Sequence, residues 1–149
     1  GISGANAVSV YCATKFAVVA MSEGWAGQFA AKNIGVSVLC PGFVQTRIYD
    51  SFRNKPARYG AADPSPIGVG QSLADTEAMV KAGIPTEPVG QRVVEAIKDN
   101  DLYIFTHTEF RPMVEARFAA IMAAFDKSEK SKALSVLGKR EVTPLPGQE

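Results

Sequence analysis

The sequence predicts an α/β protein in which helices alternate with short parallel strands. A long apolar segment at 11–32 leads into the β-branched run Val-Ser-Val-Leu-Cys at 36–40, which ends at a Pro-Gly pair. A second helical segment at 86–99 leads into another apolar run, Leu-Tyr-Ile-Phe-Thr, at 102–106. A helix that feeds a buried strand is half of a βαβ unit, and such units build a parallel sheet.

The first of these helices is expected to lie deep in the fold. Residues 1–10 are rich in Gly, Ser and Asn, which is typical of a loop that leads into a helix. The helix at 11–32 is apolar on nearly every face, and this predicts burial on more than one side. Gly35 follows it as a C-terminal stop.

The second half of the chain is less regular. Prolines and glycines interrupt residues 47–85, although a short helix is expected at about 71–82. A loop of this length commonly serves a purpose such as closing over a substrate. Thr86 is expected to cap the helix that follows. A last helix is indicated by an apolar stripe, Val114, Phe118, Ile121, Met122 and Phe125.

The composition narrows the possible functions. The chain has 149 residues, a common size for one domain, with 46% hydrophobic residues and a formal net charge of +1. This charge balance gives no field that would attract nucleic acid or an anionic membrane. No apolar run reaches the roughly 18 residues that a membrane span needs. We therefore expect a cytoplasmic protein with neither nucleic acid nor a membrane as a partner.

The metal-binding and thiol residue types give no site of their own. Cys12 and Cys40 have neither metal nor disulfide spacing and lie in apolar surroundings, so we expect buried reduced thiols. His107 is the only histidine, and no Ser, Asp or Cys arrangement surrounds it, which favours a loop residue over a catalyst. No cluster has metal-ligand spacing, so no metal is expected.

Tyr11 and Lys15 form the pair with the clearest chemical use. They are four residues apart at the start of the long helix, so both side chains lie on one helical face. A nearby ammonium and the positive end of the helix dipole both favour tyrosinate over the neutral phenol. A phenol in such surroundings can act as an acid or base near neutral pH. The spacing alone also occurs on ordinary helix surfaces, so its context decides its meaning.

That context resembles the short-chain dehydrogenase/reductase family. The run YCATKFAV, followed by a strand and the turn CPGFVQT, matches the family's Tyr-x-x-x-Lys motif and its later Pro-Gly-x-Val-x-Thr motif in order and spacing. The resemblance implies the C-terminal half of a Rossmann-like, doubly wound parallel sheet. Residues 1–126 would form this part of a single domain, with a substrate lid at 47–85 and a polar, flexible tail at 127–149.

The resemblance also implies a role for each matching residue. Tyr11 would be the general acid/base that gives or takes the alcohol proton. Lys15 would favour the tyrosinate and hydrogen-bond the nicotinamide ribose of NAD or NADP. The family activity is hydride transfer between nicotinamide and a carbonyl or secondary alcohol, in a protein that is commonly a homodimer or homotetramer.

The loop after the first strand would hold the nicotinamide end of the cofactor. Pro41 and Gly42 would shape this loop against the nicotinamide ring, and Phe43 would border the substrate. The Val44 backbone and the Thr46 hydroxyl would hold the carboxamide. A turn-capping hydrogen bond is the simpler role for Thr46, since Ser and Thr hydroxyls often bond nearby backbone.

Other parts of the family's machinery lie outside this sequence. The catalytic serine and the glycine-rich phosphate loop would precede the ten residues that stand before Tyr11, so the preference for NAD or NADP is not readable. Two strands alone bury little surface, and we expect the isolated chain to be inactive and either molten or aggregating. Two other functions stay open: a truncated, non-catalytic segment that only makes oligomer or partner contacts, and a sugar-nucleotide epimerase or dehydratase that uses the same Tyr and Lys.

Overall fold

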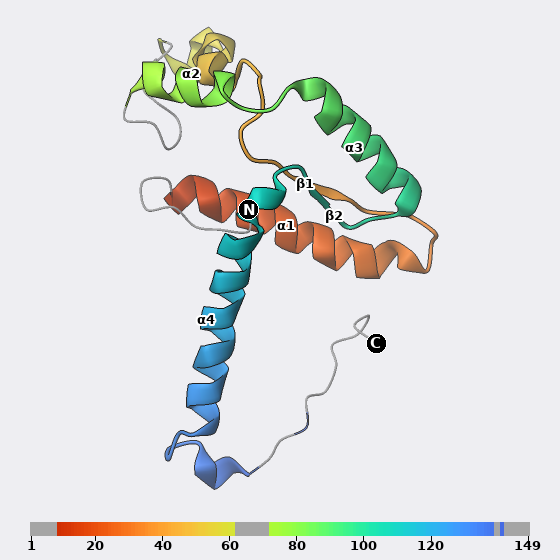
Figure 1. Cartoon of the computed structure of the whole chain (residues 1–149), viewed down its shortest axis with the longest axis vertical. Coiled ribbons are helices and arrows are strands. Elements are labelled where there is room, and N and C mark those ends of the chain that lie inside the picture. The colour runs from red at the N-terminus through yellow and green to blue at the C-terminus, as the bar shows by residue number, and fades with distance from the viewer. Residues whose placement is uncertain (1–8, 62–71, 139–140, 142–149) are drawn as a thin grey trace.

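The computed structural model describes residues 9–61, 72–138 and 141, and within these ranges the protein is an α/β fold built on one pair of parallel strands. Strand β1 (Val38–Cys40) pairs with β2 (Tyr103–Phe105), so that Val38 lies opposite Tyr103 and Cys40 opposite Phe105. The long helix α1 (Ser9–Ala30) lies on one side of this pair and α3 (Thr86–Asp99) on the other (Figure 1). The predicted fold class, α/β with a parallel sheet, is confirmed.

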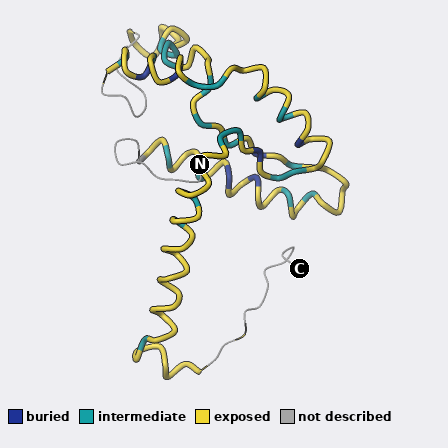
Figure 2. The backbone as a smooth tube through the Cα atoms, in the orientation of Figure 1, coloured by how far each residue is buried: buried dark blue, intermediate teal, exposed yellow. Residues whose placement is uncertain are grey.

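The small core of the chain is centred on the two strands. Val38 and Ile104 are buried on β1 and β2, and Ile104 is only 2% exposed. Val19 from α1 and Ala96 from α3 are the buried apolar residues that the described parts of the flanking helices contribute. Figure 2 shows one group of buried positions close to the strand pair and a second group, Thr76 and Val80, in α2 (Leu73–Lys81), while most of each helix is exposed. The strands therefore fix the position of whatever follows their carboxyl ends.

The expectation that the first helix would be buried on more than one side is wrong for the described residues. Only Val19 and Ser22 of α1 are buried, while Met21 and Trp25 are nearly half exposed. The physical reason is the width of the sheet, because a pair of three-residue strands covers only a short part of a helix of 22 residues. Cys12 and Cys40 are likewise half-buried and not buried as expected, and both thiols are free.

The element boundaries differ from the predicted ones in two instructive places. Thr86 is the first residue of α3, and Pro85 occupies the N-cap position without a side-chain cap, so the capping role expected for Thr86 is wrong. The left-handed Asn100 (φ 57°) ends this helix and turns the chain into β2. The last helix, α4 (Arg111–Glu129), continues beyond the polar boundary expected at 126, because its last turn is stable in spite of its charged residues.

Helix α4 extends away from the strands and the other helices (Figure 1). None of its residues is buried, and Met113, Phe118, Met122 and Phe125 are between 48% and 63% exposed. Large apolar patches that stay exposed on a soluble chain mark contact surfaces. In the described part of the chain, no helix has the length and apolar character required to cross a membrane.

Candidate active site

The candidate site lies on the loop that leaves the carboxyl end of β1, where ligands of parallel α/β proteins commonly bind. This loop, residues 41–46, is held by an isolated parallel bridge between Val44 and Ile84. The Ile84 N–H donates to the Phe43 carbonyl (3.0 Å), and the Gln45 N–H donates to the Ile84 carbonyl (2.9 Å). Ile84, 40 positions after Val44 in the sequence, therefore fixes the loop from one side.

The bridge leaves the peptide groups of Val44 free to bind something else. In a parallel bridge one residue makes both hydrogen bonds, and the groups of its partner face the other way. Here Ile84 is the residue that makes both bonds, so the N–H and C=O of Val44 are directed away from it. Thr46, two positions on, is exposed. The loop therefore carries a backbone donor at Val44 and an exposed hydroxyl at Thr46, two residues apart.

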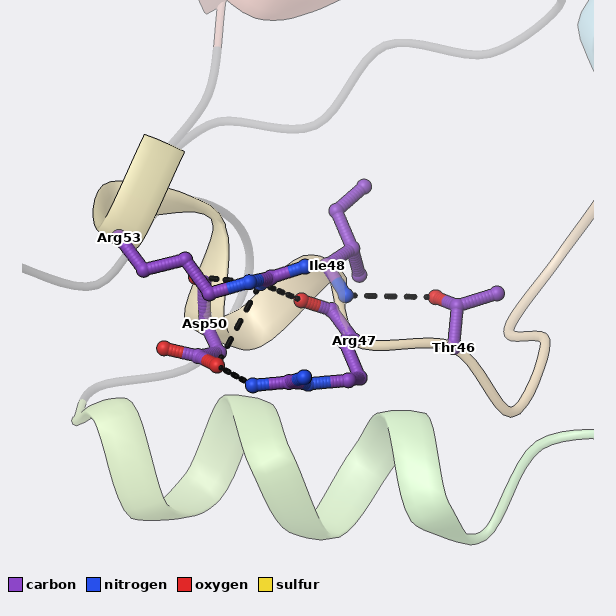
Figure 3. Close-up of polar contacts among 5 residues, drawn as sticks. All are labelled: Thr46, Arg47, Ile48, Asp50 and Arg53. Carbon is purple, nitrogen blue, oxygen red and sulfur yellow. Dashed lines mark hydrogen bonds and ion pairs between the residues drawn. The ribbon is translucent and has the colours of Figure 1, made fainter. Parts of the chain in front are cut away.

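The Thr46 hydroxyl also makes the local bond that sequence reasoning offered as the simpler explanation. Its Oγ1 accepts a long hydrogen bond (3.4 Å) from the Ile48 N–H (Figure 3). The next turn, the 3-10 helix η2 (Ile48–Asn54), is anchored by Asp50, whose carboxylate pairs with Arg47 and Arg53. The acceptor bond leaves the proton of the Thr46 hydroxyl available as a donor to a ligand.

The segment expected to be a substrate lid begins and ends at this loop. Its first part is η2 with the 3-10 helix η3 (Ala57–Tyr59), and its last part is α2 (Leu73–Lys81), capped by Ser72. Helix α2 packs against η2 and leads directly to the bridge at Ile84. Gln45 donates through Nε2 to the Lys81 carbonyl (3.2 Å). An open depression of about 420 Å³ lies at this junction, lined by Gln45, Thr46, Arg47, Tyr49 and Lys81.

Tyr11 and Lys15 lie in the first turns of α1, as the spacing predicts. The Lys15 ammonium is 5.3 Å from the centroid of the Tyr11 ring, within the range of a cation–π contact. The Tyr11 side chain is 47% exposed, so its hydroxyl is accessible. Thr14, between them, donates its hydroxyl to the Tyr11 carbonyl (2.7 Å). Among the described residues, no hydrogen bond or ion pair joins this pair to the loop at 41–46.

His107 contacts the loop in a way that sequence reasoning missed. The Gly42 N–H donates to Nδ1 of His107 (3.1 Å), and Nε2 lies 3.1 Å from the Phe43 carbonyl oxygen. His107 follows β2 directly, so it occupies the carboxyl end of the neighbouring strand. That position was the available signal, because the ends of adjacent parallel strands meet at one edge of the sheet.

Comparison with known proteins adds the family. The family model described as short chain dehydrogenase matches residues 1–57, which contain the Tyr11–Lys15 pair and the loop at 41–46. A CLA biosynthesis dehydrogenase/reductase from Lactiplantibacillus plantarum is 36% identical over 119 residues, which is 75% of this chain and 41% of that protein. A C alpha-dehydrogenase from a Sphingobium species is 29% identical over 122 residues, covering 82% of this chain and 39% of that protein.

A solved structure shares the fold. The structure of a short-chain dehydrogenase from Novosphingobium aromaticivorans superposes on 99% of this chain with a TM-score of 0.57 and 24% identity, and this chain covers 37% of it. The chain thus spans about two fifths of the length of the curated relatives that it matches. These findings favour an oxidoreductase over the non-catalytic segment considered from the sequence. The chain belongs to the short-chain dehydrogenase/reductase family of oxidoreductases.

Proposed function

We propose that the chain is part of an NAD(P)-dependent oxidoreductase that moves hydride between nicotinamide and a carbonyl or secondary alcohol, with Tyr11 as the general acid/base. The observation that supports this most is the placement of the Lys15 ammonium over the Tyr11 ring at the exposed start of α1. The Lys15 ammonium and the N-terminal end of the helix both place positive charge beside the Tyr11 side chain. The relatives named as dehydrogenases or reductases support the same reaction class.

The loop at 41–46 fits the nicotinamide end of a dinucleotide. A primary carboxamide needs one donor for its oxygen and one acceptor for its NH₂ group. The Val44 N–H faces away from the Ile84 bridge and supplies the donor. The exposed Thr46 hydroxyl oxygen uses one lone pair to accept from Ile48, and its second lone pair supplies the acceptor. Pro41 and Gly42 shape the turn that presents these groups. The bound dinucleotide supplies the hydride acceptor or donor, and the protein supplies orientation and the proton.

The residues of this chain then divide the work of proton transfer. For alcohol oxidation, Tyr11 as tyrosinate would take the hydroxyl proton of the substrate, and the bound dinucleotide would supply the hydride acceptor. For carbonyl reduction, the neutral phenol returns that proton to the substrate oxygen. Lys15 would stabilise the charged phenolate and would hydrogen-bond the ribose hydroxyls of the bound cofactor.

The substrate is proposed to lie between Phe43 and the segment at 47–85. The Phe43 side chain is 39% exposed beside the loop that would hold the nicotinamide. The depression between the loop and α2 has both aromatic and polar lining residues. This suits a small organic alcohol or ketone that presents an apolar body and one oxygen. We further propose that the exposed apolar residues of α1 and α4 serve assembly into a homodimer or homotetramer. We also propose a cytoplasmic location for the protein.

Lys15→Met tests the proposal because it keeps the length and apolar stem of the side chain but removes the charge. We expect the native gene product to oxidise secondary alcohols in the presence of NAD⁺ or NADP⁺, seen as a rise in absorbance of the reduced nicotinamide. Lys15→Met should weaken dinucleotide binding and lower turnover together, because the ammonium serves both the ribose and the phenolate. Lys32→Met is a matched control, since Lys32 also has its ammonium near an aromatic ring (5.8 Å from Phe29) but lies beyond the other end of α1. Equal turnover by both variants and the wild type would contradict the proposal.

A further inference from the structure

The imidazole of His107 joins the end of β2 to the loop that leaves β1. Its Nδ1 accepts from the Gly42 N–H (3.1 Å) and lies 2.8 Å from the Thr106 hydroxyl oxygen. Its Nε2 lies 3.1 Å from the Phe43 carbonyl oxygen. The two loop residues are 65 and 64 positions away in the sequence, so these are tertiary contacts and not features of a local turn.

The partners of the two ring nitrogens fix the protonation state of His107. A backbone N–H only donates, so Nδ1 must carry a lone pair to accept from Gly42. A carbonyl only accepts, so Nε2 must carry the proton that it donates to Phe43. The neutral ring protonated at Nε2 fits the Gly42 and Phe43 contacts, and the Thr106 hydroxyl, 2.8 Å away, shares the single lone pair of Nδ1 with the Gly42 N–H. Neither the other neutral tautomer nor the imidazolium satisfies the Gly42 N–H.

The loop and the ring are also matched in shape. A Cβ atom on Gly42 would lie 2.8 Å from the His107 ring and 2.7 Å from the Phe110 ring, so only glycine permits the ring to approach this closely. The imidazole also stacks on Phe110, with centroids 5.5 Å apart and planes within 8°, and both rings lie against Gly42. Phe110 itself begins α4 as its N-cap residue. Phe110, at the start of α4, therefore fixes the plane of the imidazole ring that contacts the loop.

We propose that His107 is a positioning residue that clamps the Pro41–Phe43 turn and so sets where the nicotinamide end of the cofactor binds. The inference rests on the proposed function, because it assigns that turn and the Val44 and Thr46 groups after it to the nicotinamide. Ile84 fixes the loop from the side of the lid, and His107 fixes it from the side of β2. Among the described residues, the polar contacts of the His107 ring are with Gly42, Phe43 and Thr106, and the first two belong to the turn assigned to the nicotinamide end.

A role confined to the nicotinamide end can be told apart from a loss of overall stability by comparing two ligands. ADP-ribose contains the adenosine, pyrophosphate and ribose of NAD⁺ but lacks the nicotinamide, and its 2′-phosphorylated form does the same for NADP⁺. If the clamp positions only the nicotinamide end, its loss weakens binding of the full dinucleotide and leaves binding of the ADP-ribose analogue unchanged. A general loosening of the fold would weaken both.

The test uses the native gene product with His107→Phe, which keeps a ring to stack on Phe110 but removes both hydrogen-bonding nitrogens. We expect Kd for the dinucleotide to rise about tenfold, the size of one to two net hydrogen bonds, with no change in Kd for the matching ADP-ribose analogue. His107→Asn places an amide oxygen near Nδ1, so it should keep the Gly42 bond and recover part of the affinity. Glu109→Gln, a change at an exposed neighbour of the ring, should leave both affinities as in the wild type.

Two results would overturn the clamp while the proposed function stands. One is an active wild type whose His107→Phe variant binds the dinucleotide as tightly as before. The other is an equal loss of affinity for the dinucleotide and its ADP-ribose analogue in both His107 variants, which would assign His107 a general structural role. A wild type that neither binds nor turns over NAD(P)⁺ would instead overturn the proposed function, and the clamp with it.

Discussion

Gly83→Ala tests whether the bridge between the lid and the loop positions the site. A Cβ atom on Gly83 would lie under 3.0 Å from the Phe43 carbonyl oxygen and 2.9 Å from the Val44 nitrogen. Ordinary carbon contacts lie at about 3.5–4 Å, so the two backbone segments must separate by roughly 1 Å. Both obstacles are backbone atoms, which cannot turn aside as a flexible side chain can.

The cost of that separation follows from the contacts that it breaks. The bridge consists of the Ile84 N–H bond to Phe43 and the Gln45 N–H bond to Ile84, at 3.0 and 2.9 Å. Each is worth about 1 kcal/mol net, and strain in the neighbouring chain adds to their loss. We expect Gly83→Ala to lower the free energy of unfolding by about 2–3 kcal/mol. At typical slopes this moves the urea midpoint down by about 1 M.

The assay is urea unfolding of the native gene product followed by the fluorescence of Trp25, together with dinucleotide-linked turnover. Gly90→Ala is the matched control, because Gly90 lies within α3 and nothing lies within 4 Å of a Cβ placed there. Alanine in a helix is favoured over glycine by roughly 0.5–1 kcal/mol, so the control should be slightly stabilised. If Gly83→Ala leaves both the midpoint and the turnover at wild-type values, the bridge does not hold the site and the reasoning is refuted.

Three further predictions concern the body of the chain. The hydrogen bond from the Tyr103 hydroxyl to Glu23 raises the pKa of Tyr103 to about 12, so the tyrosinate absorbance should show a titration near that pH that disappears in Tyr103→Phe and moves down in Glu23→Gln. Because the folded pKa is the higher one, the bond stabilises the fold below the ordinary tyrosine pKa of about 10, and this contribution should be lost as the pH rises through 12. Ile104→Ala should cost about 2–5 kcal/mol in the same urea assay, since this side chain is 2% exposed in the strand pair, and a cost below 1 kcal/mol would contradict the core described above. The isolated 149-residue chain should unfold without a sharp transition and should bind an exposed-surface dye, whereas a cooperative monomeric transition in calorimetry would show that two strands suffice.

The helices and strands were predictable because each carries a local signal. The β-branched run before Pro41 and the apolar run before Thr106 both became strands, and their parallel pairing followed from the helices that precede them. The helix at 73–81 was also within the predicted range. Local periodicity and turn residues decide such elements, and they need no knowledge of distant contacts.

The contacts that shape the candidate site could not be predicted in the same way. The bridge at Ile84 and the ring of His107 reach the loop from positions far along the chain, and no local pattern marks the bridge. The sequence neighbours of His107 offer no catalytic partner and so predict an ordinary loop residue, and only its place after a predicted strand points to the site. The burial of α1 is overestimated for another reason. Its apolar residues face several directions and would suit packing on several sides, but the two short strands cover only part of the helix.

The measurement that tests the central claim most directly is the turnover of Tyr11→Phe in the native gene product, set beside its affinity for the dinucleotide. The substitution keeps the ring under the Lys15 ammonium and removes only the hydroxyl. We expect kcat to fall at least about 100-fold while Kd for the dinucleotide stays near the wild-type value. Tyr103→Phe is the control, because Tyr103 lies at the opposite end of the strand pair from the loop and should keep full turnover. Unchanged turnover in Tyr11→Phe would contradict the assignment of Tyr11 as the general acid/base.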